Sequence, residues 1–372
     1  MDRERSDWMG IALLWALGLT ASAQFAKVAL ALEALALRYP AAPVTNAVSA
    51  LSLTGIALGV SAGVIVARLG VRRALAASVL LGPTASVIQA TLPPFSILLL
   101  LRVIEGAAHL GLVVAVPTAM AMAARPADVP VAMGLWGTFF GVGFAVWALV
   151  AQVLPEPQSA FILHGVAMLA LGWPVLRRLP PEPAVAPPRE GFLARHLAVY
   201  RAPRILAPAL GFFWHTALFL GLLTFLPGVV GSWTAALLPL SALAGTFAAG
   251  LAARTVAPSR VMLAGFVLSL AGLAALLAVP PGWQGAVSLA LMAVIGIVPG
   301  AAFADVPALN ASAADRARAN GVIAQLGNVG TALSVPAFAA AVVAGLPGLA
   351  ALAAGLSAAG IGAVWFIHRK IR

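Results

Sequence analysis

Three residues that could together bind and release a proton lie close together in an otherwise apolar stretch of the sequence. Arg102, Glu105 and His109 stand within the run 96–124. Spacings of three and four residues place their side chains on one face of a helix. A carboxylate flanked by cationic partners can bind or release a proton as those partners move. The alternative is a static buried ion pair that fixes helix packing.

Other polar side chains in the apolar stretches are candidates for contact with a small-molecule substrate. Gln24, Lys27 and Glu33 belong to the first stretch. A charge within a membrane helix costs about 2.5–3.5 kcal/mol on insertion scales, so such side chains usually face a cavity and find a partner. We therefore expect Lys27 to face the interior. The alternative is that its ammonium group snorkels to the lipid headgroups.

Two further candidates come from the second half of the chain. Gln325, Asn328 and Thr331 follow one another at intervals of three, which makes a polar stripe on one helix. His215 stands alone in the seventh apolar stretch, and His164 in the sixth ranks below it. The stripe could equally serve hydrogen bonding between helices. A lone histidine is more often a satisfied core residue than a ligand.

The elements that hold these residues must lie in lipid. Hydrophobic residues make up 62% of the 372 residues and charged residues 9%, whereas soluble domains have about 45–50% and about 25%. Cysteine is absent, which excludes disulfides and thiolate chemistry. We expect neither a metal site nor a cofactor.

Twelve apolar segments are long enough to cross a bilayer, which takes about 20 residues. They are 8–31, 43–67, 74–92, 96–124, 129–153, 158–176, 205–226, 232–253, 260–279, 283–304, 319–344 and 348–367. The predicted fold is an all-α integral membrane protein with 12 transmembrane helices in two pseudo-symmetric six-helix bundles.

The basic residues predict the orientation. With both termini in the cytoplasm, all but three of the 22 lysines and arginines lie in cytoplasmic segments. The exceptions are Arg38 outside and Lys27 and Arg102 within spans. This is the positive-inside pattern. The net charge of +11 therefore calls for no nucleic-acid partner, and the inner (cytoplasmic) membrane of the cell is the expected location.

The two halves repeat around a proline-rich connector. The predicted divisions are an N-terminal bundle (1–178), a cytoplasmic linker with a possible short amphipathic helix (179–204) and a C-terminal bundle (205–372). Matching pairs lie 186 to 190 positions apart, as in 59–68 with 245–254 and 116–117 with 306–307. Such parallel repeats place a solute site near mid-membrane between the halves.

Two motifs resemble signatures of the major facilitator superfamily. The loop after the second segment has the glycines and basic residues of the cytoplasmic signature at Gly63, Arg68, Gly70, Arg72 and Arg73. Ala67 stands where the family usually has aspartate. The fourth segment has the arginine, polar residue and glycine of a second signature at Arg102, Glu105 and Gly106, which is associated with proton-coupled members.

The resemblance implies roles for these residues. The loop residues would latch one state of a gate, with positive-inside anchoring as the alternative, and Asp305 would form a gate ion pair near Arg316 and Arg318. Spans one, four, seven and ten would line a central cavity. Lys27 could then face Glu105 or a substrate anion.

The resemblance predicts a secondary active transporter that works by alternating access. We expect a monomer that moves a small organic solute with protons, with neutral or anionic solutes slightly favoured. Glu105 is the expected proton carrier, with Arg102 and His109 as modulators. The alternatives are a proton-driven exporter of amphiphilic or cationic compounds, whose glycine-rich signature is incomplete in span five, and an uncoupled uniporter. An intramembrane enzyme would need a nucleophile–base pair that the sequence does not suggest.

Overall fold

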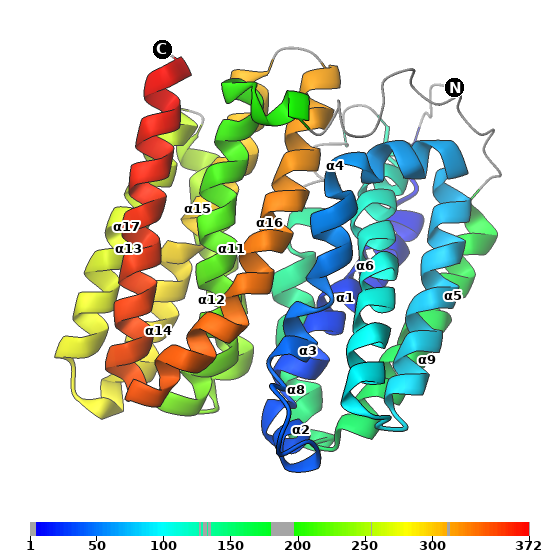
Figure 1. The fold of residues 1–372 in the computed structure, drawn as a ribbon. Coiled ribbons are helices and arrows are strands. Elements are labelled where there is room, and N and C mark those ends of the chain that lie inside the picture. The colour runs from blue at the N-terminus through cyan, green and yellow to red at the C-terminus, as the bar shows by residue number, and fades with distance from the viewer. Residues whose placement is uncertain are drawn as a thin grey trace. The chain divides into compact units, whose positions relative to one another are not determined.

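The computed structural model describes residues 5–125, 128, 132, 135–179, 197–253, 255–310 and 313–371, without the side chains at 63, 64, 67, 68, 313, 314, 316 and 317. All regular secondary structure in these ranges is helical. The predicted all-α class is confirmed (Figure 1).

Nine helical stretches among the described residues are long and apolar enough to cross a membrane. They are Trp8–Ala29, Val71–Gln89, Phe95–Ala123, Pro157–Arg178, Pro203–Val230, Thr234–Ala252, Pro258–Ala278, Pro281–Leu309 and Arg318–Ile371, the last with 54 residues. Two shorter apolar stretches are Asn46–Ala62 and Phe139–Val153. Twelve crossings and cytoplasmic termini stay predictions.

Three predicted segments differ from the helices observed. The segment 43–67 is broken into α3 (Asn46–Ser49) and α4 (Ser52–Leu69). The segment 283–304 is divided at Gly296 into α14 (Pro281–Ile295) and α15 (Ile297–Leu309). The helix α8 (Phe139–Val153) covers the later part of 129–153.

The chain divides into two compact units. The first consists of Met1–Thr54 and Ala62–Arg189, and the second of Gly55–Ser61 and Glu190–Arg372. Much of the predicted linker lies outside the described residues, so the predicted domain limits stay a prediction.

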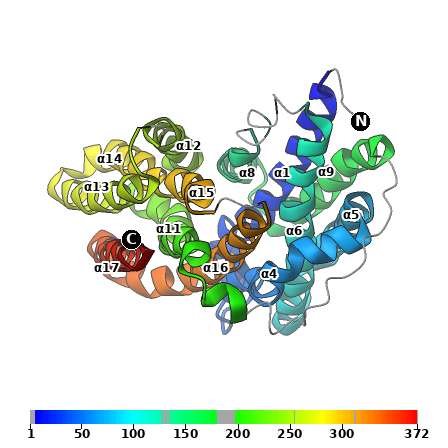
Figure 2. The same cartoon turned by 90° about the horizontal axis from the view of Figure 1, so that it is seen from above.

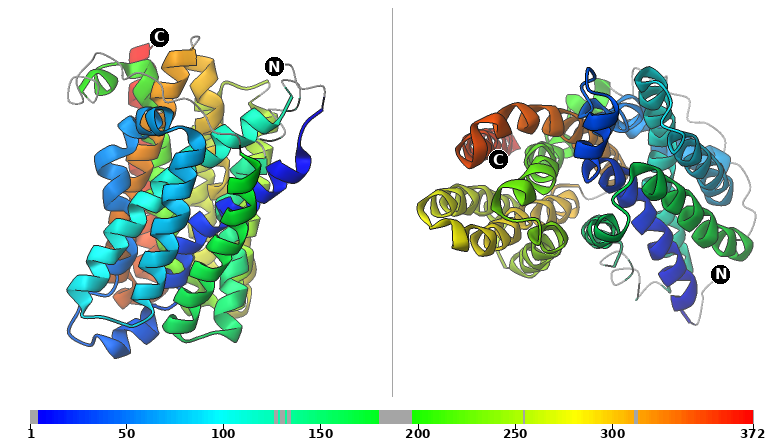
Figure 3. Two further views of the ribbon diagram at one scale, coloured as in Figure 1. Left: turned by 90° about the vertical axis from the view of Figure 1, so that its right-hand side faces the viewer. Right: turned by 90° about the horizontal axis from the view of Figure 1, so that it is seen from below.

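In the first unit, α1 crosses its neighbours obliquely (Figure 3). It contacts α6, α8 and α9, and α5 contacts α6 and α9. The other helices of this unit are α1 (Trp8–Ala29), α2 (Leu32–Arg38), α5 (Val71–Gln89), α6 (Phe95–Ala123) and α9 (Pro157–Arg178). Leu17, Leu112, Met120 and Met168 belong to its apolar core.

Glycine lets the backbones of the first unit approach closely beside the candidate residues. A Cβ atom at Gly106 would lie 2.1 Å from the carbonyl oxygen of Leu51. Because only glycine permits this approach, the short link between α3 and α4 packs directly on α6. The break in the second segment therefore brings the backbone of α3 next to Arg102 and Glu105.

In the second unit, α11 contacts α12, α14, α15, α16 and α17 (Figure 2). These helices are α11 (Pro203–Val230), α12 (Thr234–Ala252), α13 (Pro258–Ala278), α16 (Ala313–Ala341) and α17 (Gly345–Ile371). Helices α9, α11, α13 and α14 each begin at a proline, a residue preorganised for the first turn.

Small residues bring α12 against α14 and α15. A Cβ at Gly245 would lie 1.7 Å from the carbonyl oxygen of Ala293, and one at Gly296 would lie 1.9 Å from that of Ala242. In lipid, where no hydrophobic force drives helices together, such close backbone contact is a main source of association.

Candidate functional site

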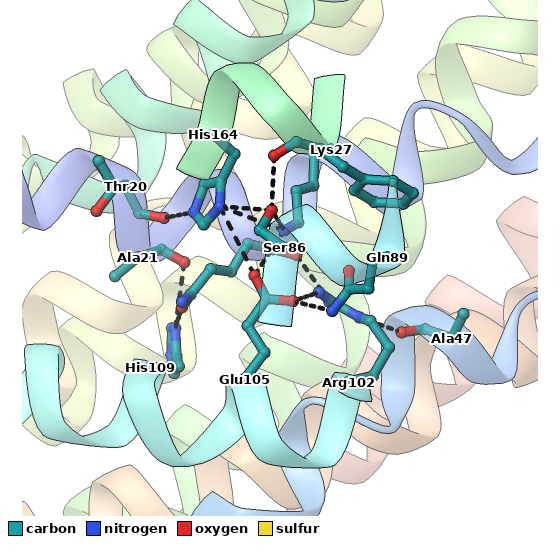
Figure 4. Close-up of polar contacts among 12 residues, drawn as sticks. Thr20, Ala21, Lys27, Ala47, Ser86, Gln89, Arg102, Glu105, His109 and His164 are labelled. Atoms are coloured by element: carbon teal, nitrogen blue, oxygen red, sulfur yellow. Dashed lines mark hydrogen bonds and ion pairs between the residues drawn. The ribbon is translucent and has the colours of Figure 1, made fainter. Parts of the chain in front are cut away.

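Glu105 lies at the centre of a fully buried polar cluster in the first unit. Its Oε1 accepts a hydrogen bond from Lys27 Nζ at 2.6 Å. Its Oε2 accepts from Gln89 Nε2 at 2.8 Å and from the Arg102 guanidinium. Figure 4 shows Arg102, Glu105 and His109 projecting from the same side of α6, as the sequence spacing predicted.

Lys27 uses all three of its ammonium protons inside this cluster. Besides Glu105, its Nζ lies 2.6 Å from Ser86 Oγ and 3.3 Å from His164 Nδ1. Its stem carries the nitrogen to 5.1 Å from the centre of the Phe161 ring. Lys27 is 1% exposed, so the snorkelling alternative is wrong.

Arg102 holds Glu105 against two backbone segments. Its Nε donates to the carbonyl oxygen of Ala47 and its second terminal nitrogen to that of Gln24, each at 2.7 Å. Each of the three guanidinium nitrogens therefore donates to an acceptor of its own. Arg102 is fully buried. The fork geometry of arginine suits this role, which a lysine point charge could not fill.

His164 and Ser86 complete the cluster from α9 and α5. His164 Nε2 lies 3.1 Å from the carbonyl oxygen of Thr20. Because a carbonyl only accepts, Nε2 carries the proton and Nδ1 of the neutral ring accepts from Lys27. Ser86 donates to the carbonyl oxygen of Phe161 at 2.8 Å and so accepts from Lys27.

The charges of the cluster do not balance. Lys27 and Arg102 carry two positive charges, whereas Glu105 carries one negative charge. With His164 neutral, no second carboxylate contacts these side chains among the described residues. A buried charge without a partner costs several kcal/mol. One buried positive charge is therefore in excess.

The His109 ring lies one helical turn from Glu105, and its described hydrogen bonds go to other residues. Its Nδ1 is 3.1 Å from both the carbonyl oxygen of Ala21 and Oε1 of Gln24. Gln24 is buried, and its Nε2 has no hydrogen-bond partner within the described part of the chain. Gln24 thus connects His109 with Arg102 and keeps one donor free.

The remaining candidates for solute contact are dispersed. Glu33 is exposed on α2 and is not part of the cluster around Glu105. His215 is buried on α11, and its Nδ1 has no hydrogen-bond partner among the described residues. Gln325 accepts from the Tyr200 hydroxyl at 2.6 Å and donates to the carbonyl oxygen of Ile56. Asn328 donates to Ala324 of its own helix.

Sequence comparison decides the family. The model of a family described as Major Facilitator Superfamily matches residues 9–335, most of the chain. The chain belongs to the major facilitator superfamily. No curated protein matches it. Members of the superfamily are transporters rather than enzymes, so this is a multi-pass membrane protein and a secondary transporter of the major facilitator type.

The superfamily's loop signature lies between α4 and α5. Gly70 has a positive φ of 80°, a conformation that glycine adopts without strain, and it turns the chain into α5. Arg72 Nε donates to the carbonyl oxygen of Leu176 at 3.1 Å, and Arg73 is exposed. The side chain of Arg68, and any side-chain environment at Gly63, lie outside the described residues.

In this superfamily member, Asp305 has a different partner from the one expected. It is buried on α15, and its Oδ2 lies 2.8 Å from His368 Nε2 on α17. Arg318 instead pairs with Asp315 at 3.4 Å, and the Arg316 side chain lies outside the described residues. Among the described side chains, Asp305 therefore pairs with a histidine, and its role in a gate stays a prediction.

Sequence reasoning missed three members of the cluster. Ser86 and Gln89 were not distinguished from other small polar residues of a membrane helix, and His164 was ranked low. Ser86, Gln89 and His164 are all fully buried. The spacing of Gln89 three positions after Ser86, on one face of a helix, was a usable signal.

Proposed function

We propose that this transporter couples the movement of a small organic solute, neutral or anionic, to the movement of protons by alternating access across the cytoplasmic membrane. The observation that carries the proposal is the Glu105 cluster, defined here as Lys27, Ser86, Gln89, Arg102, Glu105 and His164. It holds two cations and one carboxylate, all buried.

The excess charge gives the cluster two ways to reach balance. Lys27 can release a proton, which leaves a neutral amine beside the Arg102–Glu105 pair. Alternatively, an anion can approach and pair with one of the cations. Either event removes a cost of several kcal/mol. A proton and an anionic solute are thus linked through the same charge, which is the physical basis of coupling.

The Lys27–Glu105 pair is the unit that exchanges the proton in this proposal. The two side chains lie 2.6 Å apart, so they titrate together and the proton belongs to the pair. Arg102 fixes the carboxylate. Gln24 has a free buried donor beside the cluster and is the candidate to contact the solute, and His215 offers a free ring nitrogen in the second unit.

The test is proton movement in proteoliposomes that contain a trapped pH-sensitive dye. Wild type is challenged with a panel of organic anions, cations and neutral solutes, beside Lys27→Met and Glu105→Gln. We expect a solute-triggered proton flux that both variants lose. Its sign separates symport from antiport, and a response to cations alone favours the exporter alternative.

Lys27→Met decides between coupling and a static ion pair. It removes the excess charge and leaves Glu105 paired with Arg102, so the folded state should survive. Coupling predicts that tracer solute still crosses without protons. If solute and protons both cross at wild-type rates in Lys27→Met, the cluster is a packing device and the proposal fails.

A further inference from the structure

A cavity of about 310 Å³ lies at one end of the first unit. Its walls come from the end of α1, from α2, from the end of α8 and from the start of α9. Lys27 is part of its lining, as are the exposed Glu33 on α2 and the buried Trp147 on α8. The cavity therefore extends from an exposed carboxylate to the edge of the Glu105 cluster.

Two members of the cluster lie behind the inner wall of this cavity. Lys27 is one of the residues that line the cavity, and its side chain is fully buried behind the wall. Trp147 also lines it and packs edge-on against the His164 ring, with ring centroids 6.1 Å apart. Trp147 thus separates the cavity from His164, which in turn accepts from Lys27.

The cavity is large enough to hold water. Helix α1 ends and α2 begins at Leu30 and Ala31, and both residues line the cavity. The carbonyl of Ala31 already accepts from the amide of Leu35 at 2.9 Å. The volume exceeds the roughly 30 Å³ that one water molecule occupies in the liquid.

We propose that this cavity is the path by which water and protons reach the Glu105 cluster from the membrane face at which α1 ends, and that Trp147 closes its inner end. The proposal rests on the proton coupling proposed above and names its route. When Trp147 moves aside and Lys27 breaks one of its three hydrogen bonds, its ammonium group gives that proton to a water molecule that enters from the cavity. This leaves the neutral amine and a hydronium ion, and the reverse step restores the ammonium group.

The charged groups around Lys27 favour the exchange of its proton with the cavity. The charged or titratable groups that face it are Arg102 and Glu105 on α6 and His164 on α9. Glu33 stands at the outer part of the cavity, where a carboxylate attracts hydronium. The described contacts of Lys27 from α5 are to the neutral Ser86.

The first experiment measures water in the cavity without any transport. The sequence has no cysteine, so single cysteines can be placed freely. Ala160→Cys lines the cavity, whereas Ile162→Cys, two residues along the same helix, replaces a side chain that is 49% exposed and does not line it. A small, membrane-impermeant thiol reagent reacts with thiolate in water, not in lipid.

We expect Ala160→Cys to react at least tenfold faster than Ile162→Cys, and from one face of the membrane only. Adding Ala151→Phe, which fills the cavity from α8, should slow that reaction by a similar factor. Equal rates at 160 and 162 would overturn the proposal, as would reaction from both faces at the same rate.

The second experiment connects the cavity to protons. Ala151→Phe should reduce the solute-triggered dye signal at least fivefold, while Val146→Phe, on the same helix outside the cavity, leaves it unchanged. An unchanged signal in Ala151→Phe overturns the route. If the dye signal depends on Lys27 but the thiol reagent does not label Ala160→Cys, the coupling stands and the route through the cavity is refuted. If the reagent labels Ala160→Cys but wild type gives no dye signal, the proposed coupling is refuted and, with it, the proton role of the cavity.

Discussion

Removing the carboxylate of the Glu105 cluster should destabilise the protein far more than removing one of its cations. Glu105→Gln leaves Lys27 and Arg102 buried without a carboxylate partner. It loses the 2.6 Å contact to Lys27 as an ion pair and the pairing with Arg102. Breaking a buried pair by removing one partner costs about 3–5 kcal/mol.

Lys27→Met has the opposite effect on charge. Glu105 keeps its contacts to Arg102 and Gln89, and Ser86 keeps its bond to a backbone carbonyl. Methionine nearly preserves the volume of the lysine stem, and such exchanges usually cost less than about 1.5 kcal/mol.

Thermal unfolding of the purified protein in detergent measures the difference. At about 2–4 °C per kcal/mol, Glu105→Gln should lower Tm by roughly 6–20 °C and Lys27→Met by less than roughly 6 °C. The double variant Lys27→Met/Glu105→Gln leaves Arg102 as the single unpaired cation, so it should recover part of the Tm that Glu105→Gln loses. If Lys27→Met lowers Tm as far as Glu105→Gln does, the argument from excess positive charge is refuted.

Two further predictions concern packing and pH. Gly106→Ala should cost about 1–3 kcal/mol through overpacking, because its Cβ would lie 2.1 Å from a backbone oxygen. Gly355→Ala lies inside α17 with open space around its Cβ, so it should leave Tm unchanged or raise it slightly. The Asp128 carboxylate accepts hydrogen bonds from Arg125 and Ser6, which lower its pKa from 3.8. The stability that this carboxylate contributes is therefore present above pH 3.8 and is lost as the pH falls through its lowered pKa. Hydrogen exchange at the start of α1, corrected for intrinsic rates, should quicken over that range in wild type and quicken less in Asp128→Asn, where the Asp7 cap of α1 is the carboxylate that remains.

The helical segments followed from the sequence because lipid imposes a simple rule. A span needs about 20 apolar residues, and every backbone group must be paired within it. The breaks at 50–51 and at Gly296 did not follow. They depend on close contacts with other helices, such as that of Gly106 with Leu51, and hydropathy carries no information about those contacts.

The candidate site was predictable along one helix and not between helices. The spacing of Arg102, Glu105 and His109 was enough to place them on one face, because helix periodicity is local. The choice between an interior and a headgroup position for Lys27 required the structure. His164 lies 137 positions from Lys27, and the pairing of two isolated polar residues over such a separation leaves no local pattern.

The reciprocal glycine contacts between α12 and the junction of α14 with α15 restrict how the second unit can deform. At Gly245 and Gly296, each backbone fits against a carbonyl of the other. Two helices joined at such points cannot slide along each other without forcing a peptide group through its neighbour. We therefore expect α12, α14 and α15 to move together in any rearrangement of the second unit, with bending confined to their connections to other helices.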